Sequence, residues 1–250
     1  MGRLDQKVAL VTGAGRGFGR AIAERFLEEG ADLVLNYRAS RAGCDGIAQR
    51  AREAGRRAIC VQADVTDPDA VAEMVNQAIS EFGRIDILVN NAGIMHVGPF
   101  AESSEDLWQK ELDVNIFGPL RVTRAVLPHM INRRSGRIIN ISSQLAIVGW
   151  ERGAVYAGSK GFILTWTRSL AREVGQYNIT VNAICPGSIV TDMNRDIYPT
   201  PEAAEQRARE LPLRRLGTPR DVAECAVFFA SDEANFLTGQ YLGPNGGNVM

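Results

Sequence analysis

The stretch V-A-L-V-T-G-A-G-R-G-F-G, residues 8–19, joins a short apolar run to a glycine-rich loop, and a helical pattern follows it. Glycines at such a turn let the backbone approach a pyrophosphate, whose charge is stabilised by the helix N-terminus. The spacing differs from the usual G-x-G-x-x-G, because Phe18 stands three residues after Gly15. A tight turn without a ligand is the alternative interpretation. We predict that the loop binds a nucleotide through Gly13, Arg16, Gly17, Phe18 and Gly19.

Short apolar runs alternate with longer amphipathic segments along the rest of the chain. The runs show no clean alternation of apolar and polar residues, which is typical of a parallel sheet covered on both faces. Repeated strand–helix units predict an α/β fold, a doubly wound, Rossmann-like parallel sheet of about seven strands with helices on both faces. We expect strands at 8–11, 32–36, 58–62, 85–89, 137–141 and 179–184 and a last short one at 240–242, within a single domain spanning 1–250.

The segment 192–218 differs from the strand–helix pattern around it. It contains Pro199, Pro201 and Pro212 and a short helical pattern, and it precedes a final helix that begins near Pro219. Excursions beside the carboxyl edge of a sheet often cover substrates. We therefore predict a substrate lid at about 192–218, and an ordinary surface loop is the alternative.

The composition excludes several classes of protein. A net charge of −1 gives no basic field for nucleic acid. The four cysteines form no C-x-x-C pair and suggest neither a disulfide framework nor a zinc site, and the two histidines do not support a metal. No apolar run is long enough for a membrane span or a signal-peptide core. We expect a cytoplasmic protein that binds no metal, no nucleic acid and no membrane.

Tyr156 and Lys160 stand four residues apart in Y-A-G-S-K, and Ser143 precedes the tyrosine by thirteen residues. A spacing of four places two side chains on one face of a helix. A cation beside a phenol favours the phenolate, so the hydroxyl of Tyr156 would become an acid or base closer to neutral pH. The alternative is a packed helix tyrosine with its hydroxyl in water. The pattern predicts proton transfer to or from a substrate oxygen.

These motifs occur together in an order that resembles the short-chain dehydrogenase/reductase family. The resemblance covers essentially the whole chain, and its pieces are T-G-x-x-x-G-x-G at 12–19, N-N-A-G at 90–93, Ser143, Y-x-x-x-K at 156–160 and P-G at 186–187. Within the family, the stretches 169–182, 186–193 and 237–240 are most similar to the 3-oxoacyl-[acyl-carrier-protein] reductase type. The same stretches recur in sugar, polyol and other alcohol dehydrogenases of the family.

The resemblance implies a hydride transfer between a nicotinamide and a carbonyl or alcohol. It makes Tyr156 the proton donor or acceptor, Lys160 the group that lowers its pKa and holds the nicotinamide ribose, and Ser143 the group that stabilises the substrate carbonyl. Asn115 is the fourth member of the catalytic set. The implied cofactor-binding residues, besides those of the glycine-rich loop, are Asp64, Val65, Asn91, Ala92, Gly93, Tyr156, Lys160, Pro186, Gly187, Ile189 and Thr191.

The end of the second predicted strand bears on the choice between NAD and NADP. An acidic residue there would bind the ribose 2′-hydroxyl and repel a 2′-phosphate. This chain has Asn36-Tyr37-Arg38 instead, and both Arg38 and Arg16 could reach a 2′-phosphate. Two solvated surface arginines are the alternative. We predict that NADP(H) is preferred and that NAD(H) can also bind.

Pro119 lies four residues after Asn115, inside a long helical pattern that begins near Glu105. Proline has no N–H, so the carbonyl of Asn115 loses its helical partner. A freed carbonyl could hold a water linked to Lys160 and so complete a proton path. A simple helix kink is the alternative.

The helix predicted over 155–174 carries a second apolar stripe, with Val155, Phe162 and Trp166. This stripe and the resemblance lead us to expect a homotetramer, and the alternative is that Trp166 packs within its own chain. The substrate is a small carbonyl or alcohol, and our first hypothesis is an acyl thioester, reduced as a 3-oxoacyl thioester. A sugar or polyol dehydrogenase is the second hypothesis, and a non-catalytic nucleotide-sensing protein is a third from another class.

Overall fold

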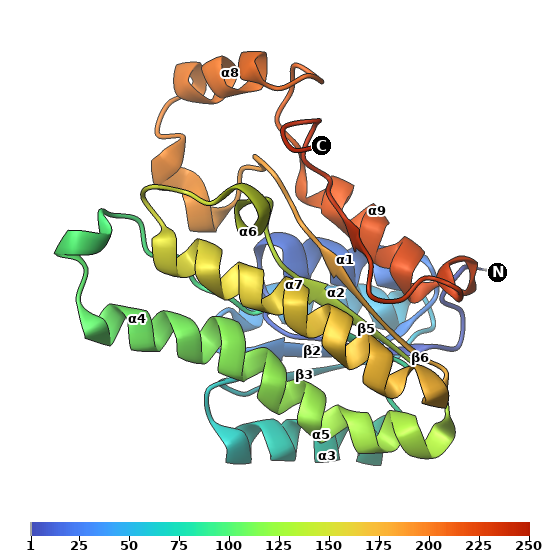
Figure 1. Ribbon diagram of the computed structural model, residues 1–250. Coiled ribbons are helices and arrows are strands. Elements are labelled where there is room, and N and C mark those ends of the chain that lie inside the picture. Colours follow the sequence, from blue (N-terminus) through green and yellow to red (C-terminus); the bar gives the residue numbers. More distant parts are fainter. Residues whose placement is uncertain (1) are drawn as a thin grey trace.

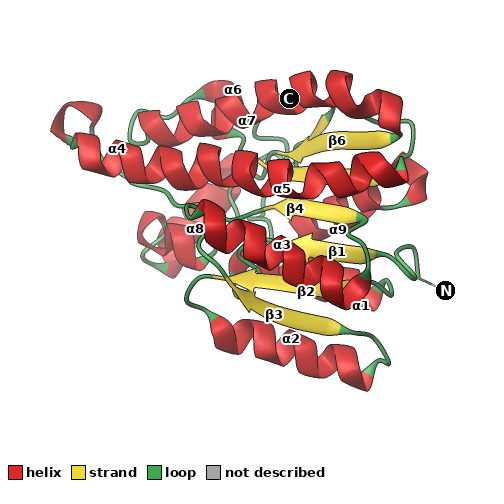
Figure 2. Ribbon diagram, turned by 90° about the horizontal axis from the view of Figure 1, so that it is seen from below, coloured by secondary structure: helices red, strands yellow, loops and turns green. Residues whose placement is uncertain are grey.

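The computed structural model describes residues 2–250, with the side chains of residues 194–196 lying outside the described part. Within these residues, seven parallel strands form one sheet in the order β3-β2-β1-β4-β5-β6-β7 (Figure 2). The predicted doubly wound, Rossmann-like sheet is therefore confirmed. The strands are β1 (Val8–Val11), β2 (Asp32–Tyr37), β3 (Ala58–Gln62), β4 (Ile87–Asn90), β5 (Gly136–Ile141), β6 (Ile179–Ile184) and β7 (Tyr241–Leu242).

Helices cover both faces of the sheet (Figure 1). One face packs against α1 (Gly17–Glu28), α2 (Arg41–Glu53) and α9 (Pro219–Ala230), and the other against α3 (Pro68–Phe82), α5 (Gly118–Arg133) and α7 (Ala154–Val174). The shorter helices α4 (Glu105–Leu112), α6 (Leu145–Val148) and α8 (Pro201–Glu210) lie beyond the carboxyl ends of the strands. Because both faces are covered, the central strands β1, β4 and β6 are buried throughout and can be apolar at nearly every position.

The path of the chain reverses between β1 and β4. From β1 the chain moves outward to β2 and β3, and it then returns to pair β4 with the other side of β1. In open α/β sheets, ligands bind at the carboxyl ends of the strands where the order reverses in this way. The fold therefore places a candidate site above the ends of β1 and β4.

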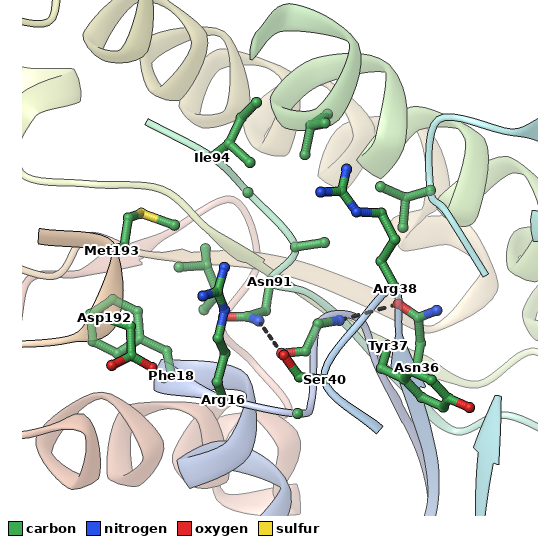
Figure 3. Close-up of a pocket in the computed structure, with 18 of the residues that line it drawn as sticks. Arg16, Phe18, Asn36, Tyr37, Arg38, Ser40, Asn91, Ile94, Asp192 and Met193 are labelled. Carbon is green, nitrogen blue, oxygen red and sulfur yellow. Dashed lines mark hydrogen bonds between the residues drawn. The ribbon is translucent and has the colours of Figure 1, made fainter. Parts of the chain in front are cut away.

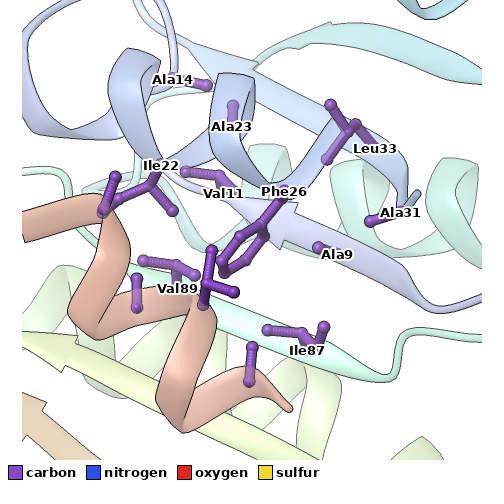
Figure 4. Packing of buried hydrophobic residues seen from close by; sticks show 14 of the residues in the cluster. Ala9, Val11, Ala14, Ile22, Ala23, Phe26, Ala31, Leu33, Ile87 and Val89 are labelled. Atoms are coloured by element: carbon purple, nitrogen blue, oxygen red, sulfur yellow. The ribbon is translucent and has the colours of Figure 1, made fainter. Parts of the chain in front are cut away.

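The packing of α1 holds the glycine-rich loop at that point. Phe26 and Ile22 of α1 are completely buried against Val11 of β1 and Val89 of β4, and α9 closes the same cluster from the side (Figure 4). Since α1 begins at Gly17, directly after the loop, this apolar contact also fixes the direction of the helix N-terminus.

The long helix that the sequence predicts from Glu105 is interrupted in the structure. It ends at Leu112, a π-helical segment η2 (Asp113–Phe117) follows, and α5 starts at Gly118 with Pro119 in its first turn. The N–H of Gly118 donates to the carbonyl of Asp113, five residues earlier, and so closes the wider turn. Proline needs no helical N–H partner in a first turn, which explains why the break occurs here.

The segment 192–218 contains a 3-10 helix, η4 (Asp192–Ile197), and α8, which Figure 1 shows standing away from the sheet. Arg207 of α8 donates to Ser188 Oγ at 3.0 Å and to Asn248 Oδ1 at 2.8 Å. These bonds tie α8 to the segment that follows β6 and to the C-terminal residues. That this segment is a substrate lid, within one domain spanning 1–250, stays a prediction.

Two glycine-to-alanine changes in helices should have opposite effects on the urea midpoint of unfolding. A Cβ at Gly19 would lie 2.3 Å from the carbonyl oxygen of Gly13, whereas one at Gly46 of α2 meets nothing within 4 Å. Gly46→Ala should raise the free energy of unfolding by about 0.5–1 kcal/mol through helix propensity. Gly19→Ala should lower it, because the backbone of the loop must shift. Equal stabilisation by both changes would contradict this packing.

Candidate active site

A cavity of about 210 Å³ lies above the carboxyl ends of β1, β2 and β4 (Figure 3). It extends from the glycine-rich loop, past the ends of β2 and β3, to the residues after β4 and the first turns of α7. Of the predicted cofactor-binding residues, those that line it are Gly13, Arg16, Gly17, Phe18, Arg38, Asp64, Val65, Asn91, Ala92, Gly93, Tyr156, Lys160 and Thr191.

Hydrogen bonds hold the glycine-rich loop open beside the cavity. Gly13 and Gly17 have φ angles of 64° and 54°, which glycine adopts without strain. The N–H of Gly13 donates to Asn36 Oδ1 at 3.2 Å, and the amide of Asn91 donates to the carbonyl of Gly13 at 3.3 Å (Figure 3). The loop backbone and the N-terminus of α1 can thus receive a phosphate, which fits the cofactor that the sequence implies.

Gly19 does not line the cavity, in contrast to its predicted role. Its missing side chain allows α1 to approach the loop, since a Cβ there would lie 2.3 Å from Gly13 O and 2.4 Å from Asn91 Nδ2. The close packing of α1 against the loop therefore requires glycine at this position, and contact of Gly19 with a cofactor stays a prediction.

Thr12 links β1 to β4 directly below the cavity. Its hydroxyl donates to the carbonyl of Val89 at 3.2 Å and accepts from the N–H groups of Asn91 at 2.9 Å and Ala92 at 3.0 Å. The N-N-A-G segment is thereby fixed to the end of β1. The sequence gave no signal that Thr12 would link the two strands. It also gave no signal that Ser40 and Ile94 would line the cavity.

Arg16 and Arg38 extend into one end of the cavity (Figure 3). The side chain of Arg38 is 68% exposed, and its Nη1 lies 3.6 Å from Asp64 Oδ2. Burial would raise the pKa of Asp64, but hydrogen bonds from Thr66 and the Arg38 guanidinium lower the pKa below its usual value. Asp64 therefore stays ionised beside Arg38, and the charged groups that line this part of the cavity are Arg16, Arg38, Asp64 and Asp192.

Tyr156 and Lys160 lie at the other end of the cavity, on the first turns of α7. They are only 9% and 5% exposed. The ammonium of Lys160 donates to the carbonyl of Ile141 at 2.9 Å and lies 5.7 Å from the centroid of the Tyr156 ring. The structure thus brings both groups to the same wall, with the ammonium held by the end of β5.

The pKa values of this pair differ from the expectation. Burial raises the pKa of Tyr156 to about 12, a hydrogen bond with Ser143 opposes that shift, and the carboxylate of Glu111 adds to it. Burial likewise lowers the pKa of Lys160 to about 8. The expected lowering of the phenol pKa by Lys160 is therefore wrong for this arrangement. Desolvation prevails, and the ammonium binds a carbonyl oxygen.

Asn115 and Ser143 are buried and are not among the residues that line the cavity. The completely buried amide of Asn115 accepts from Ile94 N at 2.9 Å, donates to Ile94 O at 2.9 Å and donates to Ser159 Oγ at 3.2 Å. A Cβ at Gly93 would lie 3.2 Å from Asn115 Oδ1 and 3.5 Å from Lys160 Nζ. Asn115 therefore lies close to Lys160, and the proposed water link from its backbone carbonyl stays a prediction.

Three further predicted residues lie outside the cavity lining. The carbonyl of Pro186 accepts from Gln144 N at 3.0 Å, Gly187 N donates to Pro244 O at 3.1 Å, and Ile189 is buried in the core. Thr191 does line the cavity, together with Asp192 and Met193. The segment after β6 thus reaches the cavity only at its end, and the roles of the first three stay predictions.

No group of three or more histidine, cysteine, aspartate or glutamate side chains in the described part of the chain could hold a metal ion. No helix in that part combines the length and apolar character that a membrane crossing needs.

Comparisons with known proteins agree with this architecture. Residues 13–248 match the family described as enoyl-(acyl carrier protein) reductase. The 3-oxoacyl-[acyl-carrier-protein] reductase FabG of Staphylococcus aureus is 39% identical over 244 residues, which cover 98% of each chain. The versicolorin reductase stcU of Emericella nidulans is 44% identical over 256 residues, covering 98% of this chain and 96% of the relative.

Among solved structures, a blue fluorescent protein from a metagenomic library, in complex with NADPH, superposes with a TM-score of 0.92. It is 37% identical, and the match covers 99% of this chain and 100% of that one. These similarities extend over the whole sheet, the glycine-rich loop and the helix with Tyr156 and Lys160. The chain therefore belongs to the short-chain dehydrogenase/reductase family and is an NAD(P)-dependent oxidoreductase.

Proposed function

We propose that this oxidoreductase uses NADPH to reduce a 3-oxoacyl thioester to a 3-hydroxyacyl thioester. The observation that carries the proposal is one cavity with two arginines at one end and a protonated phenol at the other. Arg16 and Arg38 can bind a 2′-phosphate, and Tyr156 can protonate a carbonyl oxygen. The likeness to the S. aureus reductase supports the thioester as substrate.

When bound, the reduced nicotinamide supplies the hydride, for which the protein has no group of its own. The phenol of Tyr156 holds the proton that the substrate oxygen takes up as its charge develops. Ser143, which hydrogen-bonds the phenol, would also donate to that oxygen. The ammonium of Lys160 is held toward the cavity and can bind ribose hydroxyls.

The pKa of Tyr156 suits the proton donor that reduction of a carbonyl needs. With a pKa near 12, the phenol keeps its proton at neutral pH and is ready to donate it. Oxidation of an alcohol would instead need a phenolate, which burial disfavours here.

Versicolorin reduction is the second candidate function, because the fungal versicolorin reductase is 44% identical to this chain. A panel of a 3-oxoacyl thioester, versicolorin, a sugar or polyol and a 2-enoyl thioester would separate these substrates. The highest kcat/KM identifies the substrate class, and binding of NADPH without turnover of any compound would favour the nucleotide-sensing alternative.

We also propose a homotetramer. Phe162 of α7 and Phe117 of η2 are 39% and 51% exposed, so both elements present apolar side chains to solvent. Trp166, by contrast, is half-buried against the core of its own chain, so it contributes less to this surface than the sequence suggests. Sedimentation velocity measures the number of subunits in solution, and a monomer would contradict the proposed tetramer.

Tyr156→Phe should lower kcat by about 10²–10⁴-fold, the range for losing a general acid, while the dissociation constant of NADPH changes little. Tyr177→Phe is the matched control, because Tyr177 packs against the core and Arg134 and does not line the cavity. Steady-state kinetics and fluorescence titration measure the two quantities. Near-wild-type kcat in Tyr156→Phe would exclude this mechanism.

Arg38→Ala should lower kcat/KM for NADPH by about 10–100-fold and leave kcat/KM for NADH almost unchanged, because a charge-assisted hydrogen bond contributes about 1.5–3 kcal/mol. Arg52→Ala, an exposed arginine of α2, serves as the control. A strong preference of the wild type for NADH, or equal losses with both cofactors, would contradict the proposed NADP preference.

The affinity for NADPH should fall as the pH rises through about 8. Burial lowers the pKa of Lys160 to that value, so the ammonium is present below it and lost above it. The dissociation constant should therefore rise about tenfold or more around pH 8, because a charged hydrogen bond becomes a neutral one; this rise is the limb of the pH profile. Lys160→Arg should remove the limb, since arginine stays charged, and Lys110→Met should keep it. A flat profile in the wild type counts against the role of Lys160.

A further inference from the structure

Glu111 is a carboxylate in the last turn of α4 that the proposed mechanism does not use. It is only 2% exposed, whereas Glu105 and Lys110 of the same helix lie in solvent. A buried carboxylate is costly unless hydrogen bonds or opposite charges compensate it. Its surroundings therefore indicate what the side chain does.

The first of its contacts is with the loop that follows β4. The N–H of His96 donates to Glu111 Oε1 at 3.2 Å, and the amide of Asn115 binds both the N–H and the carbonyl of Ile94 at 2.9 Å. Glu111 and Asn115 are one helical turn apart, so they lie on the same face of their helix. Together they hold two alternate residues of the loop, of which Ile94 lines the cavity.

The second relation of Glu111 is electrostatic. Its negative charge acts on Lys160 and Tyr156 of α7, the helix against which α4 packs. Among the described residues, the ionisable groups whose charges act on Lys160 are this carboxylate and the thiol of Cys185, and the ring centroid of Tyr156 lies 5.7 Å from its Nζ. Of these, Glu111 is the only acid that would be ionised at neutral pH in water. It is therefore the main compensation for the buried ammonium.

His96 completes the surroundings of the carboxylate. Its Nδ1 lies 3.8 Å from Glu111 Oε2 and has no hydrogen-bond partner among the described residues. Burial raises the pKa of Glu111, while the N–H of His96 and the charges of His96 and Lys160 oppose that rise. Both side chains border a second cavity of about 250 Å³ between α4 and the start of α7.

We propose that Glu111 is a positioning residue for the reaction: its carboxylate holds the loop after β4 beside the cofactor cavity and keeps Lys160 in its ammonium form. This proposal rests on the proposed role of Lys160 in binding NADPH. A negative neighbour favours the charged form of an amine, so loss of the carboxylate should make Lys160 release its proton at lower pH.

Glu111→Gln separates the charge from the loop contact. The glutamine oxygen can still accept from His96 N, so the loop should keep its place while the negative charge is lost. We expect the limb in the pH dependence of NADPH dissociation, near pH 8 in the wild type, to move down by about one pH unit in this variant. Fluorescence titration of NADPH at a series of pH values measures the shift without requiring turnover.

Glu105→Gln is the matched control, since it makes the same change on the exposed face of the same helix and should leave the limb in place. A Glu111→Gln limb at the wild-type pH, or a loss of affinity that is equal at every pH, overturns the proposal and leaves the role of Lys160 intact. A wild type without any limb instead refutes the role of Lys160, and this inference with it.

Glu111→Asp provides a second readout should the glutamine variant not fold. It keeps the charge but shortens the reach to His96, so the limb should stay near the wild-type pH even if the affinity falls. A limb displaced as far in Glu111→Asp as expected for Glu111→Gln would show that charge is not the cause and would overturn the proposal.

Discussion

The hydroxyl of Thr12 joins the two strands between which the cofactor site forms. It accepts two N–H groups of the segment after β4 and donates to β4 itself, so the ends of β1 and β4 keep one spacing where the chain path reverses. The glycine-rich loop starts one residue later and is held by Asn36 and Asn91. These side-chain bonds, together with the backbone bonds from Thr12 N to Val89 O and from Ala14 N to Asn36 O, fix the floor of the cavity beyond the strand ends.

Burial, more than proximity, sets the chemistry at the far end of the cavity. Tyr156 and Lys160 lie on the inner face of α7, where desolvation favours the neutral form of each. A phenol that keeps its proton is suited to donating it, while the buried lysine keeps a pKa near 8 because a neighbouring negative charge opposes part of the effect of burial. Glu111 supplies that charge from the last turn of α4, just before the π-helical segment that contains Asn115. The protonation of Lys160 in α7 therefore depends on this helix.

The sequence predicts the fold well because its signals are local. Short apolar runs mark every strand to within two or three residues, and the Gly-Pro pair at 118–119 marks the interruption near Asn115. Thirteen of the predicted cofactor-binding residues line the cavity, and most of them follow strand ends, whereas Tyr156 and Lys160 lie in α7. The direction of the Tyr156 pKa shift, the packing role of Gly19 and the burial of Glu111 were beyond prediction, because each depends on segments far away in the sequence.

The protonation state of Tyr156 in the free protein tests this account most directly. The near-ultraviolet absorbance of tyrosinate can be followed with pH in the wild type and in Tyr156→Phe, and their difference reports this one phenol. The account predicts no difference up to at least pH 10, since burial raises the pKa to about 12. A tyrosinate signal that appears near neutral pH in the wild type alone would contradict it.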